Sequence, residues 1–217
     1  MASPKILKIN EIFYSIQGES TYAGLPCVFV RLAYCNLRCT YCDTQYAFYE
    51  GKDMTIDQIV EQVQRYNSHL IEITGGEPLL QENVHLLIKQ LLALDYEVLL
   101  ETGGHLDIAR VDPRVKRIVD VKCPSSGEAQ KMHWPNLTIL NHHDQVKFVI
   151  GNKQDFDYAL QVVQKYELIK RCPVLFSPVF GQLENRKLAE WILASGLPVR
   201  MQIQLQKYIW SPDQRGV

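Results

Sequence analysis

Two kinds of apolar pattern alternate along the chain, and this alternation constrains the fold more than any other feature of the sequence. Short β-branched and aromatic runs, such as CVFVRL at 27–32, have the composition of buried strands. Between them lie segments such as 55–66, whose apolar residues recur every three to four positions as on one face of a helix. The pattern predicts strands at 6–15, 27–32, 70–74, 97–101, 117–121, 146–150, 174–176 and 199–205, and helices at 55–66, 83–94, 155–166 and 185–194.

Alternating strands and helices imply βα units and therefore a mainly parallel sheet. Crossovers between parallel strands are almost always right-handed, so such a sheet curls toward a barrel or a doubly wound sheet. A full eight-fold barrel takes ~250 residues, whereas this chain has 217. We therefore expect an α/β fold with an incomplete (β/α) barrel in one domain, 1–217. Ligands bind at the carboxyl ends of the strands in such sheets.

Composition excludes several classes of protein. Hydrophobic residues make up 47% and charged residues 22%, which is typical of a globular chain. The formal charge of −1 argues against a protein that binds a nucleic-acid backbone. No apolar run reaches the ~18 residues of a membrane span, and the N-terminus has no signal-peptide pattern. We expect a cytoplasmic protein that binds neither nucleic acid nor a membrane.

Three of the six cysteines, at 35, 39 and 42, form a C-x3-C-x2-C array just after the strand at 27–32. A cytoplasmic chain keeps its thiols reduced, so clustered cysteines indicate metal or redox chemistry. Three closely spaced thiolates can hold one face of a 4Fe–4S cube and leave the fourth iron open. Two alternatives remain: one face of a helix, and a zinc site completed by a histidine or by a cysteine at 27, 123 or 172. Weak helix formers and the absence of paired zinc-ribbon spacing favour the cluster.

Several other segments follow predicted strands and so belong to the same edge of the sheet. I-T-G-G-E-P at 73–78 has two glycines that permit close backbone approach and a glutamate suited to an ammonium group, although alone it is most often a tight turn. E-T-G-G at 101–104 and K-C-P-S-S-G at 122–127 occupy equivalent positions. Taken singly, Arg31 fits a salt bridge at a strand end and Thr44 an ST-turn.

Together these segments resemble the radical S-adenosylmethionine (SAM) superfamily. The resemblance implies that Cys35, Cys39 and Cys42 hold a 4Fe–4S cluster whose open iron binds SAM through its amino and carboxylate groups. The aromatic residue expected before the third cysteine is present, and Cys123 is expected only to pack in a loop. The residues that the resemblance assigns to cofactor binding are Tyr41, Cys42, Asp43, Gly76, Glu77, Thr102, Lys122 and Ser125.

Within that superfamily the chain resembles the 7-carboxy-7-deazaguanine synthases from residue 11 to residue 207. The resemblance is carried by N-E-I-F-Y-S-I-Q-G-E-S at 10–20, F-V-R-L at 29–32 and C-D-T at 42–44, together with the I-T-G-G-E-P segment. It implies a magnesium ion bound by the hydroxyl of Thr44. The implied substrate-binding residues are Ile16, Gln17, Gly18, Arg31, Thr74 and Val217, with Arg31 facing a carboxylate.

The resemblance also implies a reaction and its partners. Flavodoxin or ferredoxin would supply one electron, SAM would be cleaved, and the resulting radical would abstract hydrogen from C6 of 6-carboxy-5,6,7,8-tetrahydropterin. The product would be 7-carboxy-7-deazaguanine, a queuosine precursor, with loss of ammonia, and the enzyme would be a homodimer. Rival readings are an activating enzyme for a glycyl-radical protein and a zinc-stabilised binding module without catalysis.

Two features of the C-terminal part bear on the residues expected at the substrate site. Gln206 stands where some members of the family have a histidine, so the role of that late histidine is not expected here. The polar tail 211–217 contains proline and glycine and has no apolar stripe, so its composition favours fraying. If the tail is ordered, the terminal carboxylate of Val217 near the substrate is one explanation, and a packing contact is the other.

Overall fold

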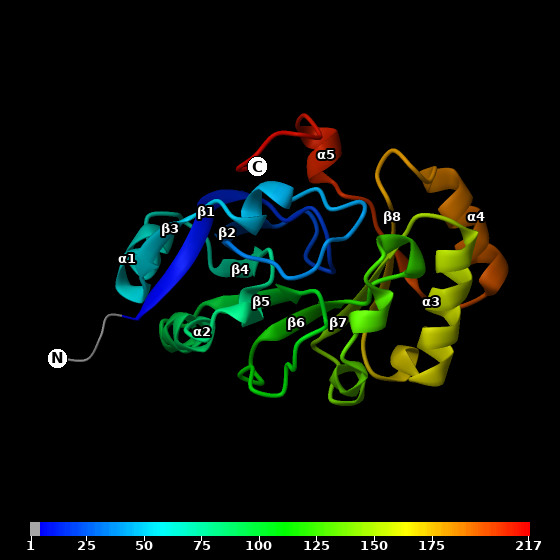
Figure 1. Ribbon diagram of the computed structural model, residues 1–217, viewed down its shortest axis with the longest axis horizontal. Helices are drawn as coiled ribbons and strands as arrows, with labels where there is room; N and C mark the ends of the chain where they lie inside the picture. The colour runs from blue at the N-terminus through cyan, green and yellow to red at the C-terminus, as the bar shows by residue number, and fades with distance from the viewer. Residues whose placement is uncertain (1–4) are drawn as a thin grey trace.

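The computed structural model describes residues 5–217 and, within them, shows one open nine-stranded sheet in the order β3-β1-β2-β4-β5-β6-β7-β8-β9 (Figure 1). Strand β1 pairs antiparallel with β2 and β3, and all pairs from β2 to β9 are parallel. The expected mainly parallel, incomplete barrel is confirmed. The strands are β1 Ile6–Ile16, β2 Pro26–Leu32, β3 Lys52–Thr55, β4 Leu70–Gly75, β5 Glu97–Thr102, β6 Lys116–Asp120, β7 Gln145–Ile150, β8 Val174–Pro178 and β9 Arg200–Met201.

The longer helices pack on one face of the sheet and form the main hydrophobic core with it. Ile59, Leu87, Phe156 and Ile192 point from the helices into this core, where each buried side chain stabilises the fold by roughly 1.5–3 kcal/mol. No helix in the part of the chain that the structure describes is long and apolar enough to cross a membrane. The helices are α1 Ile56–Val63, α2 Val84–Ala93, α3 Lys153–Lys165, α4 Asn185–Ser195 and α5 Gln206–Ile209.

Most differences from the predicted elements lie at their ends. The helix predicted at 55–66 begins at Ile56, because Thr55 is its N-cap in a capping box with Gln58. The strand predicted at 199–205 is wrong beyond its first residues: only Arg200 and Met201 pair with β8, and the chain then turns into α5. Strand β3 was not predicted. The expected lack of an export signal concerns in part residues 1–4, which lie outside the described residues.

On the other face of the sheet, the side chains change from apolar to charged toward the carboxyl ends of the parallel strands. Side chains alternate between the faces of a strand, so Phe29 and Arg31 of β2 share this face, as do Leu70 and Glu72 of β4. The lower layer is the apolar cluster of Phe13, Cys27, Phe29, Leu70, Leu99 and Ile118. Nearer the carboxyl ends of the strands lie Arg31, Glu72, Thr74, Glu101, Asp120 and Lys147.

Both glycines of the I-T-G-G-E-P segment are required by close packing within the chain. A Cβ on Gly75, which has φ +141°, would lie 2.1 Å from the carbonyl oxygen of Leu32, and one on Gly76 would lie 2.2 Å from that of Tyr34. The backbone after β4 is thereby fixed against the segment that leads into the cysteine array: the N–H groups of Gly76 and Glu77 donate to those same carbonyls at 3.1 and 2.8 Å.

Candidate active site

A cavity of about 1190 Å³ lies at the carboxyl edge of the parallel strands. The cysteine array borders it on one side and the C-terminal segment on another, while the charged layer of the sheet contributes to its lining. Two of the sequence-predicted residues, Glu77 and Ser125, lie outside the lining. The predicted residues that line it are Ile16, Gln17, Gly18, Arg31, Cys35, Cys39, Tyr41, Cys42, Asp43, Thr44, Thr74, Gly76, Thr102, Lys122 and Val217.

The three clustered cysteines lie on an irregular loop and not on a helix, so the helical alternative is wrong. All three are free and partly buried. Burial raises the pKa of the Cys39 thiol to about 11, so without a metal this group is protonated at neutral pH. The remaining cysteines, Cys27, Cys123 and Cys172, are buried and line no part of the cavity.

This loop fits an iron–sulfur cluster by its donor set. Soft thiolates select iron–sulfur centres or zinc. Within residues 5–217, no three cysteine, histidine or carboxylate side chains converge on one ion position. A 4Fe–4S cluster binds each thiolate through a different iron, so it does not require the three sulfurs to meet at a point.

The side chain of Glu77 braces the strand ends from outside the cavity. It is fully buried, and its carboxylate accepts hydrogen bonds from the Thr102 hydroxyl and from the backbone N–H groups of Gly103 (2.8 Å) and Leu79 (3.1 Å). Burial raises the pKa of this carboxyl, while these donors oppose the shift. The carboxylate therefore connects the turn after β4 to the glycine pair after β5.

Lys122 and Ser125 have different surroundings although they belong to one loop. Lys122 Nζ lies 2.7 Å from Asp120 Oδ2; burial lowers its pKa, but Asp120 and the Cys39 thiol outweigh burial and raise the pKa well above its usual value. A cation is thus held beside the cysteine loop. Ser125 instead bonds through its hydroxyl to Asp155, and its carbonyl accepts from the Thr40 hydroxyl at 2.7 Å.

Arg31 is oriented by its neighbours and still faces the cavity. Its Nε lies 2.7 Å from Glu11 Oε1, which also accepts a hydrogen bond from Tyr46 Oη at 3.0 Å. The guanidinium carbon lies 5.6 Å from the ring centre of Phe13. The salt bridge expected from the sequence alone is therefore present, and it uses only one edge of the guanidinium.

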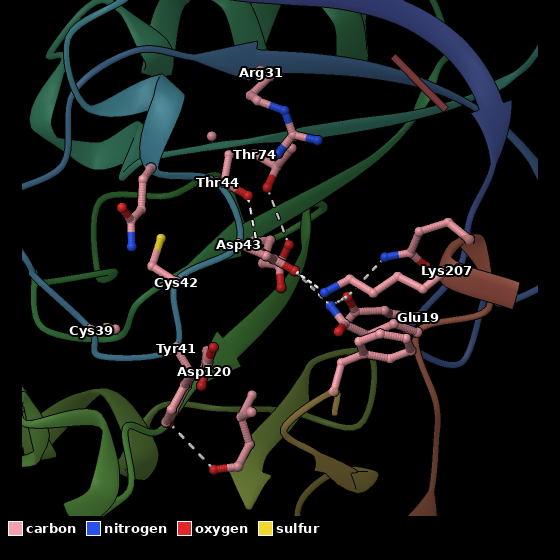
Figure 2. Close-up of a pocket in the computed structure, with 18 of the residues that line it drawn as sticks. Glu19, Arg31, Cys39, Tyr41, Cys42, Asp43, Thr44, Thr74, Asp120 and Lys207 are labelled. Carbon is pink, nitrogen blue, oxygen red and sulfur yellow. Dashed lines mark hydrogen bonds and ion pairs between the residues drawn. The ribbon is translucent and has the colours of Figure 1, made fainter. Parts of the chain in front are cut away.

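Thr44 and Asp43 place hard oxygen atoms in the lining of the same cavity (Figure 2). Thr44 Oγ1 donates to Asp43 Oδ1 at 3.0 Å, and Lys207 Nζ lies 2.8 Å from Asp43 Oδ2. Burial raises the pKa of the Asp43 carboxyl, but Lys207 and hydrogen bonds from Gln204 and Thr44 outweigh it and hold the pKa well below its usual range. The pair offers oxygen donors of the type that magnesium prefers.

A second network of charged side chains, centred on Lys147, connects strands that are far apart in the sequence. Thr74 Oγ1 donates to Glu101 Oε2 at 3.1 Å, and the other oxygen of Glu101 forms an ion pair with Lys147. Lys147 also lies 3.1 Å from Glu19 Oε2. Glu19 in turn accepts hydrogen bonds from Gln204 and from two further glutamines of the C-terminal segment, Gln202 and Gln206.

The C-terminal tail lies along the cavity. The guanidinium carbon of Arg215 is 3.8 Å from the ring centre of Tyr46, and its Nη1 lies 3.0 Å from Glu50 Oε2. Val217 is part of the cavity lining. The tail therefore meets the loop that follows the cysteine array, as the proximity of the C-terminus to that loop in Figure 1 also shows.

Sequence reasoning missed Glu72, Asp120, Lys147 and Lys207 as cavity residues. For two of them the sequence contains a usable indication: Glu72 and Lys147 are charged residues inside otherwise apolar strands, and such residues are rarely buried without a partner or a function. Lys207 gives no comparable indication, because its role depends on α5 folding back over the loop of Asp43.

Comparison with known proteins gives one consistent result. Residues 30–181 match the model of the radical SAM superfamily. A 7-carboxy-7-deazaguanine synthase from Chlorobaculum tepidum is 50% identical over 220 residues, covering 100% of both chains. Another, from Koribacter versatilis, is 42% identical over 226 residues and covers 97% of this chain and 100% of its own. The crystal structure of QueE from Escherichia coli has the same fold, with a TM-score of 0.78, 21% identity and coverage of 92% and 94%.

Proposed function

Because the chain belongs to the 7-carboxy-7-deazaguanine synthases, a family of lyases in the radical SAM superfamily, we propose that its cavity converts 6-carboxy-5,6,7,8-tetrahydropterin to 7-carboxy-7-deazaguanine with loss of ammonia. The observation that carries this assignment to the site is the meeting of the cysteine array and Arg31 in one cavity. One wall can hold an iron–sulfur cluster, and the other presents a cation to a carboxylate.

Cys35, Cys39 and Cys42 would hold the 4Fe–4S cluster beside bound SAM. When bound, the cluster and SAM together supply a 5′-deoxyadenosyl radical for hydrogen abstraction. Gly76, Thr102 and Lys122 line the same cavity near these cysteines, which supports them as cofactor contacts. Further cofactor contacts would come from Tyr41, Asp43 and the Ser125 loop, whereas Glu77 would act mainly by fixing the strand ends against each other.

Arg31 would bind the substrate carboxylate. Glu11 occupies its Nε, so the two terminal nitrogens remain for a planar two-point contact with a carboxylate. Ile16, Gln17, Gly18 and Thr74 would contact the ring. The lining position of Val217 supports closure of the pocket by the C-terminus.

Magnesium would bind at the Thr44 hydroxyl, with Asp43 beside it and the substrate carboxylate as a further ligand. Flavodoxin or ferredoxin would deliver the electron. We also propose that the enzyme works as a homodimer in the cytoplasm. The oxygen donor pair supports the magnesium assignment, and the family supports the others.

An anaerobic turnover assay tests the proposal. Protein reconstituted with iron and sulfide should be brown, should contain about four irons per chain, and should form 7-carboxy-7-deazaguanine from the carboxytetrahydropterin, SAM, magnesium and a reductant. A colourless protein with one tightly bound zinc would support the binding-module alternative. A brown protein that cleaves SAM but leaves the pterin unchanged would point to another substrate, such as the glycyl-radical partner of an activating enzyme.

A further inference from the structure

One buried carboxyl group in the cavity lining, that of Glu72, has no cation within salt-bridge distance among residues 5–217. Within the described chain, each other acidic group from the sheet and its adjoining loops that lines the cavity has a lysine within 4.0 Å: Asp43 has Lys207, Asp120 has Lys122, and Glu19 and Glu101 share Lys147. Glu72 forms no such pair, although only 3% of its surface is exposed.

The position of Glu72 explains why its carboxyl group reaches the cavity. It lies in the middle of β4, in register with Phe29 of β2 and Leu99 of β5. Both neighbours belong to the apolar cluster beneath the cavity. The side chain therefore stands at the boundary where the apolar layer ends and the polar lining begins, in an environment that penalises an unpaired charge.

Gln17 holds this carboxyl group in one orientation. Gln17 Nε2 donates to Glu72 Oε2, and Gln17 Oε1 accepts from the backbone N–H of Glu19 at 2.9 Å, which fixes the amide. Within residues 5–217, Glu72 Oε1 has no hydrogen-bond partner, and the residue lines the cavity. One oxygen is therefore used for positioning, and the other is left for a ligand.

The charged and titratable groups around Glu72 favour its neutral form. Burial is the largest cause that raises the pKa of this carboxyl well above its usual value, and Glu101 of β5 and Glu19 after β1 raise it further. Lys147 of β7 and Arg31 of β2 oppose the shift but lie beyond salt-bridge distance. The thiol of Cys27, on the same face of β2, is itself kept protonated by burial.

We propose that Glu72 is a specificity-determining substrate contact: its protonated carboxyl group, oriented by Gln17, donates a hydrogen bond from Oε1 to an acceptor of the pyrimidinone ring of the pterin. This inference rests on the proposed function. An amide-like heterocycle with a ring nitrogen or carbonyl acceptor is the ligand class that a neutral carboxyl donor complements. A ligand without that acceptor would leave the buried O–H without a partner, which is the basis of discrimination.

The test compares three variants of the reconstituted enzyme. Glu72→Gln keeps a neutral donor and acceptor, Glu72→Leu removes both, and Glu97→Gln makes the same carboxyl-to-amide change on β5 outside the cavity lining. Binding is measured with pterin-6-carboxylate, whose fluorescence reports the bound fraction in the presence of SAM and magnesium. Turnover is measured with the carboxytetrahydropterin. Thermal unfolding of each variant checks that it folds.

We expect Glu72→Gln and Glu97→Gln to bind the probe within about threefold of the wild type and Glu72→Leu to bind it roughly 5- to 150-fold more weakly, with a matching rise in KM. Wild-type affinity should fall at alkaline pH as the donor proton is lost, and Glu72→Gln should lack that part of the pH dependence. Equal weakening in Glu72→Gln and Glu72→Leu, or unchanged binding in Glu72→Leu, would overturn the inference. A folded wild-type enzyme that neither binds the probe nor converts the pterin would instead overturn the proposed function.

Discussion

Thr102 Oγ1 lies 2.9 Å from each oxygen of the Glu77 carboxylate, and both side chains are buried. The glutamate belongs to the turn after β4 and the threonine ends β5, so this contact sets the relative position of two strand ends that border the cavity. All the hydrogen-bonding groups in the network around the carboxylate act as donors toward it. The arrangement of the two strand ends therefore depends on this group remaining an acceptor.

Glu77→Gln should therefore destabilise the fold and weaken SAM binding together. The amide places its own N–H donors against the N–H and O–H donors of the network, so at least one buried donor loses its acceptor, at a cost of about 1–3 kcal/mol. Denaturant unfolding and equilibrium dialysis with SAM measure the two effects. Glu82→Gln, an exposed carboxylate paired with Arg110, is the matched control and should change neither. Normal stability in Glu77→Gln would contradict the assigned bracing role.

The cysteines divide into two sets with different expected phenotypes. Alanine in place of Cys35, Cys39 or Cys42 should abolish the cluster, because each thiolate binds its own iron. Alanine at the three buried cysteines should lower stability but leave about four irons per chain. Iron content and the visible spectrum after anaerobic reconstitution separate the sets. Loss of iron in Cys123→Ala, with Cys39→Ala still loaded, would reverse the assignment.

The sequence predicted the repeating elements well because their periodicity reflects burial on one face. It failed at β3, where Lys52–Thr55 is short and polar and becomes a strand only by pairing with Ile6–Ile9. It failed again at 199–205, where the alternating V-R-M-Q-I-Q-L pattern is typical of a strand. There the glutamine side chains bind Glu19 and the backbone of Ser20 instead of continuing an edge strand.

For the site, residues from each segment with characteristic spacing line one cavity, since strand ends meet at one edge of a parallel sheet. The roles of single side chains were harder to predict. Ser125 turns to Asp155, and Glu77 turns away from the cavity, because their partners come from segments far away in the sequence. The ion pairs of Lys147 could not be predicted for the same reason: they need β5 and the loop after β1 to be placed first.

Thr44→Ala should lower turnover by weakening magnesium while leaving SAM cleavage in place. The hydroxyl is the proposed ligand, and its loss also removes the hydrogen bond to Asp43. We expect the magnesium concentration for half-maximal turnover to rise at least about tenfold, because even the loss of an outer-shell partner of a bound metal typically costs about 10- to 100-fold in affinity. Thr44→Ser should retain most of the affinity, and Thr138→Ala, with an exposed hydroxyl far from the cavity lining, should behave as the wild type. An identical magnesium dependence in Thr44→Ala would argue against the site.

Deletion of Gly216 and Val217 tests the tail. If the terminal carboxylate closes the pocket, the truncated enzyme should show a raised KM for the pterin with unchanged iron content and SAM binding. Arg215 retains its contacts with Tyr46 and Glu50 in this variant, so the rest of the tail should stay in place. Arg215→Ala is the complementary change, because it releases the tail without shortening it. Wild-type kinetics in the truncated protein would leave the tail with a packing role only.

His105 should make the stability of the metal-free protein depend on pH in a defined window. Burial first, and then Lys122 and Lys131, lower the pKa of this imidazole from 6.5 to about 4. Its Nε2 lies 2.6 Å from Asn36 Oδ1, while the buried Nδ1 has no hydrogen-bond partner in the described part of the chain and lies 3.6 Å from Glu77 Oε2. The folded protein thus binds a proton more weakly than the unfolded chain, so the contribution of His105 is fully present above about pH 6.5 and is lost as the pH falls toward about 4.

The matched measurement is the free energy of unfolding of the metal-free protein between pH 7.5 and about 4. His105→Gln can still donate to Asn36 but does not titrate, so its free energy should fall less steeply over this window than that of the wild type. His69→Gln, at an exposed position, should follow the wild-type slope. Parallel curves for His105→Gln and the wild type would show that the imidazole takes up a proton as readily in the folded protein as in the unfolded chain.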